Sequence, residues 1–107
     1  MKIIYNDFIP FKGYKAINLF GFLFTRNIYT ISDVDINHES IHTEQMKEML
    51  YIPFYIWYMI EWLIRLVSYG DAKLAYKTIS FELEASSNQQ DENYLKNRKR
   101  FAWFKYI

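Results

Sequence analysis

The stretch that decides the fold is residues 32–42, Ser-Asp-Val-Asp-Ile-Asn-His-Glu-Ser-Ile-His, because the chain changes character there. Serine and aspartate at its start are residue types that cap the N-terminus of a helix, so the sequence predicts a helix from about Asp33 to Leu50. Residues 1–30, before it, are rich in Ile, Phe, Tyr and Thr, which predicts two or three strands with a turn near residues 11–13. A β-rich part therefore precedes a helical part.

Beyond this stretch, helix breakers divide the chain. Pro53 ends the first helix and suits the first turn of the next one, and Gly70 is a typical C-terminal stop. Further helices are predicted over residues 54–68, 72–86 and 92–101. The predicted fold class is α+β, with a small N-terminal sheet packed on three to four helices in one domain, residues 1–107.

Composition bounds the function. The chain has 107 residues, of which 51% are hydrophobic, so a packed core is expected rather than disorder. It contains no cysteine, which excludes disulfides, a thiolate nucleophile and cysteine-based metal sites. The formal charge of +1 argues against a surface built to bind a phosphate backbone, so no nucleic acid partner is expected.

The informative motif within the first predicted helix is His38-Glu39-Ser40-Ile41-His42, an H-E-x-x-H pattern. Residues four apart lie on one helix face, so His38 and His42 could both ligate one zinc ion, with Glu39 beside them. Zinc lowers the pKa of a bound water, and Glu39 would accept its proton as the water attacks a polarised carbonyl. The motif uses both histidines of the chain and predicts a zinc site with Glu39 as the catalytic base.

A catalytic zinc usually has three protein ligands, and no third histidine exists, so the third ligand is expected to be a carboxylate. Glu82 and Glu84 are the candidates, and on one helix they would point about 200° apart. Small or apolar residues share the stripe of Glu82, which favours it as the ligand without settling the choice.

These motifs resemble the gluzincin class of zinc peptidases, whose downstream helix carries a Glu-x-x-Ala signature, here Glu82-Leu83-Glu84-Ala85. The size resembles the minigluzincins, single-domain peptidases of about a hundred residues. The resemblance implies a zincin-like fold, His38, His42 and Glu82 as metal ligands, and Glu39 as general base. Ser86 stands where many relatives have an aspartate that orients a ligand histidine.

The resemblance also implies a peptide substrate, held by β-augmentation on a strand before the motif helix. That strand would supply the substrate-binding residues Phe20, Gly21, Phe22, Leu23 and Phe24. The predicted function is therefore a zinc metalloendopeptidase. An oxyanion would need a donor near the metal, and the candidates are Tyr76, Tyr94, Arg98 and Arg100.

Two alternatives belong to other classes. One is a non-catalytic zinc-binding protein of the same fold. The other is a membrane-surface or nucleic-acid-binding module that uses residues 96–107, which carry five cations, no acid and four aromatic residues. Ordinary core packing explains these aromatics too. A further hypothesis places residues 101–107 over the metal cleft as an inhibitory tail, with Trp103 or Tyr106 in a substrate pocket.

Apolar runs bear on localisation. Residues 17–24 lack the cleavage pattern of a signal peptide. Residues 49–60 are interrupted by Pro53 and end at Glu61, short of the roughly 20 residues that a membrane helix needs. We therefore expect a cytoplasmic protein without a transmembrane segment, with membrane-surface association as a minor alternative. The sequence does not indicate the oligomeric state.

Overall fold

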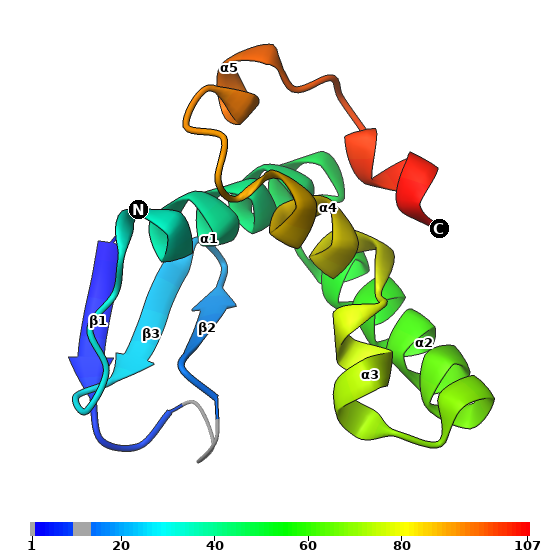
Figure 1. Ribbon diagram of the computed structural model, residues 1–107, viewed down its shortest axis with the longest axis horizontal. Coiled ribbons are helices and arrows are strands. Elements are labelled where there is room, and N and C mark those ends of the chain that lie inside the picture. Colours follow the sequence, from blue (N-terminus) through cyan, green and yellow to red (C-terminus); the bar gives the residue numbers. More distant parts are fainter. Residues whose placement is uncertain (1, 10–13) are drawn as a thin grey trace.

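The computed structural model describes residues 2–9 and 14–107 and confirms the α+β class with a small N-terminal sheet (Figure 1). The turn predicted near residues 11–13 lies outside the described residues. The strands are β1 (Lys2–Asn6), β2 (Ala16–Leu19) and β3 (Phe22–Arg26). The helices are α1 (Asp33–Glu48), α2 (Ile52–Tyr69), α3 (Ala72–Lys77), α4 (Ser80–Asn88), α5 (Tyr94–Asn97) and the 3-10 helix η1 (Ala102–Tyr106).

The sheet has the strand order β1-β3-β2, so β3 is the central strand. β1 pairs with β3 in parallel. β2 pairs with β3 in antiparallel register, with Leu19 opposite Phe22. Phe20 and Gly21 connect the two antiparallel strands and both have positive φ, as a tight hairpin turn requires. The Tyr55 hydroxyl on α2 accepts the Phe20 N–H, which helps to hold this left-handed residue. β2 is left at the edge of the sheet.

α1 begins with a capping box. The Ser32 side chain accepts the Asp35 N–H, and the Asp35 carboxylate accepts the Ser32 N–H. After α1, Leu50 and Tyr51 adopt positive φ, and α2 leaves at a bend of 112°. Within residues 2–9 and 14–107 no single helix is long and apolar enough to cross a membrane, and only the bent pair α1 and α2 passes that test jointly.

The single helix predicted over residues 72–86 is wrong, because the chain breaks between α3 and α4. Glu61 on α2 stabilises the break, since its carboxylate accepts the backbone N–H of Ser80 at 3.0 Å as well as the Ser80 hydroxyl. At the other end of α4, the Asn37 amide on α1 donates to the carbonyl of Asn88, the last residue of the helix, and to two carbonyls just beyond it. Polar side chains from α1 and α2 therefore fix both ends of α4.

Aromatic rings form the centre of the core. The Phe81 ring lies 4.5 Å from that of Phe54 and 4.7 Å from that of Trp103, measured between centroids. Met46 and Ile79 complete this buried cluster. Residues from α1, α2, α4 and η1 thus share one core, which places α4 directly against α1.

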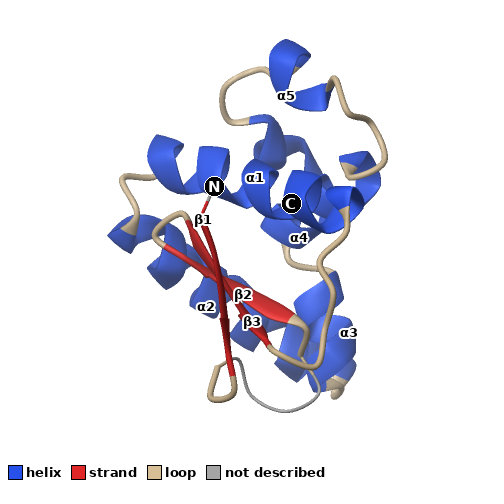
Figure 2. Cartoon of the chain, turned by 90° about the vertical axis from the view of Figure 1, so that its left-hand side faces the viewer, coloured by secondary structure: helices blue, strands red, loops and turns tan. Residues whose placement is uncertain are grey.

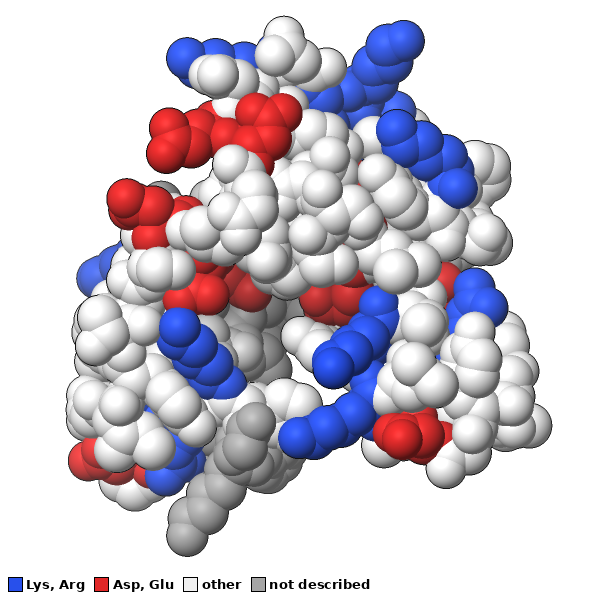
Figure 3. All heavy atoms as spheres, viewed as in Figure 1, with Lys and Arg blue, Asp and Glu red and all other residues white. Residues whose placement is uncertain are grey.

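The sheet lies on one side of the molecule and the helices α2 and α3 on the other, with α1 running across the top between them (Figure 1). A hollow separates the two sides. The space-filling view shows this hollow, with acidic side chains beneath α1 and basic ones along the rim (Figure 3). α5 lies at the end of the molecule remote from the sheet (Figure 2). The edge strand β2 therefore faces the helices across the hollow.

Candidate metal centre

His38 and His42 lie one turn apart on α1, and their rings face α4. The two Nε2 atoms are 3.1 Å apart, and Glu82 Oε1 lies 3.1 Å from that of His38 and 3.0 Å from that of His42. Neutral imidazoles and an ionised carboxylate would each present a lone pair here. Three lone pairs at these distances repel one another unless protons or a metal ion lie between them.

The spacing fits a metal ion. A tetrahedral ion with ligand bonds of about 2.0–2.1 Å separates its ligand atoms by roughly 3.3 Å. The separations among the His38, His42 and Glu82 atoms are 3.0–3.1 Å. His38, Glu39 and His42 also offer ligand atoms that all lie within 4.8 Å of one another. The cluster could therefore hold a metal ion.

Two glutamine side chains orient the imidazoles. His42 Nδ1 lies 2.7 Å from Gln45 Oε1, and His38 Nδ1 lies 2.7 Å from Gln89 Oε1. The amide nitrogen of Gln45 donates to Phe81 O and to Glu84 Oε1, so its oxygen must face His42. Because an amide oxygen only accepts, each Nδ1 donates, and the Nε2 of a neutral ring is left as the ligand atom.

Glu82 is buried among groups that favour its ionised form. Its second oxygen accepts the Tyr58 hydroxyl at 2.6 Å. Burial opposes ionisation, but the charge of His42 and hydrogen bonds from both imidazoles hold the pKa of Glu82 far below its ordinary value. Burial likewise opposes a charged His42, yet the Glu82 carboxylate raises the His42 pKa to about 10. The pair strongly attracts positive charge.

Glu39 lies beside the cluster, on the cavity side. Its Oε2 is 4.0 Å from His38 Nε2, and burial raises the pKa of its carboxyl group above the ordinary value. The Asn18 amide on β2 donates to the backbone carbonyl of Glu39, which ties the motif helix to the edge strand. Glu39 is thus placed next to the cluster and against the sheet edge.

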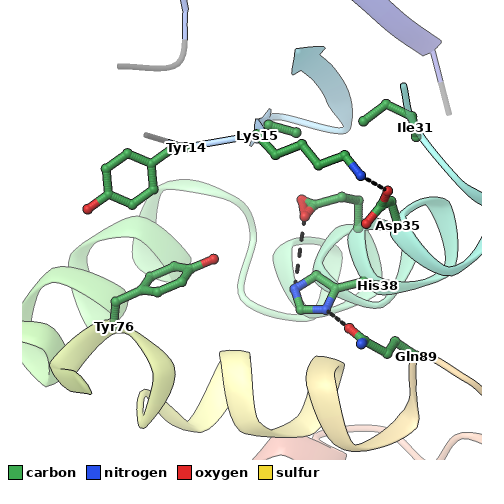
Figure 4. A pocket seen from close by; sticks show the side chains of 9 residues that line it. Tyr14, Lys15, Ile31, Asp35, His38, Tyr76 and Gln89 are labelled. Atoms are coloured by element: carbon green, nitrogen blue, oxygen red, sulfur yellow. Dashed lines mark hydrogen bonds and ion pairs between the residues drawn. The ribbon is translucent and has the colours of Figure 1, made fainter. Parts of the chain in front are cut away.

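Two adjoining hollows open beside the cluster and share Tyr14, Ala16, Glu39 and Tyr76. The larger, about 440 Å³, has a mainly apolar lining and reaches His42 and Glu82. The smaller, about 190 Å³, reaches His38 and Gln89. Figure 4 shows the Tyr76 hydroxyl pointing from α3 into this space, toward the side of His38. Residues lining the larger hollow include Ile17, Leu19, Met46, Phe54, Tyr55, Tyr58, Met59 and Trp62.

Of the two candidate carboxylates, Glu82 contacts both imidazoles, whereas Glu84 lies on the other side of α4. The continuous stripe that favoured Glu82 does not exist, because the helix is broken before Ser80. Tyr94 and Arg98 both bind Glu84, away from the cavity, and Arg100 is exposed. Among the predicted oxyanion donors, only Tyr76 lines the cavity.

The strand predicted to bind substrate is not at the edge of the sheet. Phe20 and Gly21 form the hairpin turn, and Phe22, Leu23 and Phe24 belong to β3, which is paired on both sides. A central strand has no edge to offer an added peptide. All four β2 residues line the larger hollow instead.

The proposed inhibitory tail is also wrong. Trp103 is only 2% exposed and packs on Phe81 in the core, and the Tyr106 hydroxyl accepts a hydrogen bond from Asn88. The residues that line the two hollows include none from 101–107. Core packing, the competing explanation, accounts for these aromatics.

Three partners of the cluster, Gln45, Gln89 and Tyr58, were not among the predicted site residues. Gln45 follows His42 by three residues on the same helix face, so its spacing could have revealed it. Gln89 and Tyr58 gave no such local signal, because they come from distant segments.

Comparisons with known protein families, curated proteins and solved structures give no match.

Proposed function

We propose that this chain is a zinc-dependent metallopeptidase whose zinc is held by His38, His42 and Glu82. One observation carries the proposal: three ligand atoms converge to within 3.1 Å of one another at the wall of a mainly apolar cavity. Two imidazoles and a carboxylate, with one position left for water or substrate, are typical ligands of catalytic zinc. When bound, zinc would polarise a substrate carbonyl and acidify water.

Glu39 is the proposed general base. It sits beside the ligand atoms and lines both hollows, so a water molecule and a carbonyl carbon could both come within its reach. Its carboxylate would accept a proton from the attacking water and then pass that proton to the leaving amine. It is not needed as a ligand, because Glu82 supplies the third donor atom.

Tyr76 is the proposed donor to the oxyanion. Its ring packs edge-on against Tyr14 at a centroid distance of 6.3 Å, and its hydroxyl points into the cavity (Figure 4). Burial and the nearby carboxylates of Glu82 and Glu39 raise its pKa, so the hydroxyl keeps its proton at neutral pH. It would donate a hydrogen bond to the negative charge that develops on the carbonyl oxygen.

The edge strand β2 is the proposed peptide-binding element. The Asn18 carbonyl accepts the Tyr55 hydroxyl from α2, so the backbone of Asn18 faces away from β3. Ala16, two residues earlier, faces the same way, because hydrogen-bonding direction alternates along an antiparallel strand. An extended peptide could pair with Ala16 and place a large apolar side chain in the larger hollow.

The proposal is tested with Glu39→Gln. The purified wild-type chain should contain about one zinc per chain and cleave denatured casein or a peptide library. Glu39→Gln should lower the rate about 10²–10⁴-fold at unchanged zinc content, because only the base is lost. Glu44→Gln is the matched control, since Glu44 lies on the same helix but pairs with Lys47 at the surface.

The outcomes separate the alternatives. Equal rates for wild type and Glu39→Gln would contradict the assigned base. Bound zinc without cleavage of any peptide would indicate the non-catalytic alternative. Iron in place of zinc would contradict the assignment of the metal as zinc, since two histidines and one carboxylate also suit non-haem iron. His42→Ala should lose metal and activity together.

A further inference from the structure

α2 presents an outward surface made only of apolar side chains, here called the apolar face. Its seven residues are 48–87% exposed. At 100° per residue, their directions span about 140° of the helix circumference. The members are Ile52, Ile56, Met59, Ile60, Leu63, Ile64 and Val67.

The polar groups of α2 point the other way. Glu61 binds Ser80, and the Tyr58 hydroxyl binds Glu82, so the helix directs its hydrogen-bonding side chains inward. A surface helix normally does the opposite. Aliphatic faces of this length are rarely left in water, and they mark a contact with another surface.

The exposed area supports a protein partner. A folded monomer of 13.1 kDa is expected to expose about 6400 Å². This chain exposes 6999 Å². The surplus of roughly 600 Å² approaches the roughly 800 Å² that each partner buries in a standard interface.

The spacing and charge of α2 favour a helix as the covering element. Ile56, Ile60, Leu63 and Val67 alternate steps of four and three residues, the spacing of a helix–helix seam. The helix carries only one acid and one base, Glu61 and Arg65. Helices that bind membrane surfaces are typically rich in Lys and Arg instead.

We propose that the apolar face is the interface of a symmetric dimer, in which α2 packs antiparallel on α2 of a second copy. A twofold axis makes one patch self-complementary, so an uncharged apolar stripe can cover its own copy without any charge repulsion. The middle of α2, near Ile60, would lie at the axis. The proposal does not depend on the metal centre.

The test measures the mass of the full chain by sedimentation at tens of micromolar. Wild type should have twice the 13.1-kDa mass. Ile60→Asp should raise the dissociation constant by at least about 100-fold, because it places two like charges together at the axis. Ile28→Asp is the control, since Ile28 is 80% exposed in the loop after β3 and should leave the dimer intact.

A second measurement keeps the test independent of the folding of Ile60→Asp. The chain has no cysteine, so Ile60→Cys should form a disulfide-linked dimer on oxidation, whereas Ile28→Cys should not. A wild-type monomer at these concentrations would overturn the proposal. So would a monomer that floats with phosphatidylcholine–phosphatidylglycerol vesicles, which would assign the face to a membrane surface.

Discussion

Two buried glutamates, two residues apart on α4, have opposite surroundings. Glu84 is fully buried, and both of its oxygens accept hydrogen bonds, from Arg98 at 2.5 and 3.0 Å, Tyr94 at 2.6 Å and Gln45 at 3.0 Å. Glu82 instead accepts the Tyr58 hydroxyl on one oxygen at 2.6 Å, and the Tyr76 hydroxyl also hydrogen-bonds to this carboxylate. Its other oxygen faces the Nε2 atoms of two imidazoles.

The difference separates a structural carboxylate from a candidate ligand. Burial would raise the pKa of Glu84, but hydrogen bonds from Arg98, Tyr94 and Gln45 hold it below its ordinary value, so its charge is balanced within the fold. Glu82 Oε1 and the Nε2 atoms of the two imidazoles are three potential acceptors that face one another, and a cation between them would bind all three. Gln45 joins the two sites, because it donates to Glu84 and accepts from His42.

The largest expected effect comes from removing the Arg98 cation that balances the charge of Glu84. Arg98→Met leaves the buried Glu84 and the partly buried Glu48 without their cation, and should lower the free energy of unfolding by about 3–5 kcal/mol. Urea denaturation with chelator present measures this loss. Arg100→Met makes the same change at an exposed position and should cost less than about 0.5 kcal/mol.

The stability difference between wild type and Arg98→Met should depend on pH in a defined direction. In wild type, the lowered pKa of Glu84 contributes stability above the ordinary glutamate value of 4.5, and this contribution is lost as the pH falls further. In Arg98→Met, burial should raise the pKa of Glu84. Protonation of Glu84 then removes its unpaired charge as the pH falls toward 4.5, and the destabilisation of the variant decreases. The stability difference should therefore narrow on acidification. A constant difference would mean that packing, not charge, carries the effect.

A pair of glutamine variants tests whether the two sites are distinct. Glu82→Gln should weaken zinc binding by more than about 100-fold, because losing a ligand should exceed the 10–100-fold cost of losing an outer partner. Glu84→Gln should instead lower the unfolding free energy and change zinc affinity by less than about tenfold. Competition with a chromogenic chelator measures both affinities. Equal losses of affinity would show that the two carboxylates form one site.

The sequence predicts the features that depend on local spacing. His38 and His42 meet because four residues make one helical turn, whatever the rest of the fold does. The capping box at Ser32 and the break before α2 also follow from neighbouring residues. The α+β class follows from the change in composition near Asp33.

Features that depend on remote groups could not be predicted. The break before α4 is stabilised by Glu61, 19 residues away from Ser80. The strand order leaves β2 rather than β3 at the edge, and Phe20 in a left-handed turn is not a residue type that signals one. The sequence favours Glu82, which does contact the imidazoles, but the reasoning assumed a continuous helix that the structure does not have.

A smaller effect is expected from Gln45, the residue shared by the two sites. Gln45→Leu removes the acceptor that orients His42 Nδ1, and it should weaken zinc binding by about 10–100-fold. Nitrogen-15 NMR of the imidazole should show a changed tautomer population for His42, which a purely packing role would not produce. Gln90→Leu, at an exposed position, is the control. Unchanged affinity and tautomer would mean that His42 is oriented by the helix alone.

The smallest effect is expected from Tyr58→Phe, which tests how far Glu82 depends on the Tyr58 hydroxyl. The ring should stay in place, because it packs against Phe54 and stacks on Phe81, so only the 2.6 Å hydrogen bond to Glu82 is lost. Zinc affinity should fall by about tenfold or less, since a metal ion would still hold the other oxygen. Tyr69→Phe, on the exposed end of α2, is the control. A loss above about 100-fold would show that Glu82 relies on protein donors as Glu84 does, and the contrast between the two carboxylates would no longer hold.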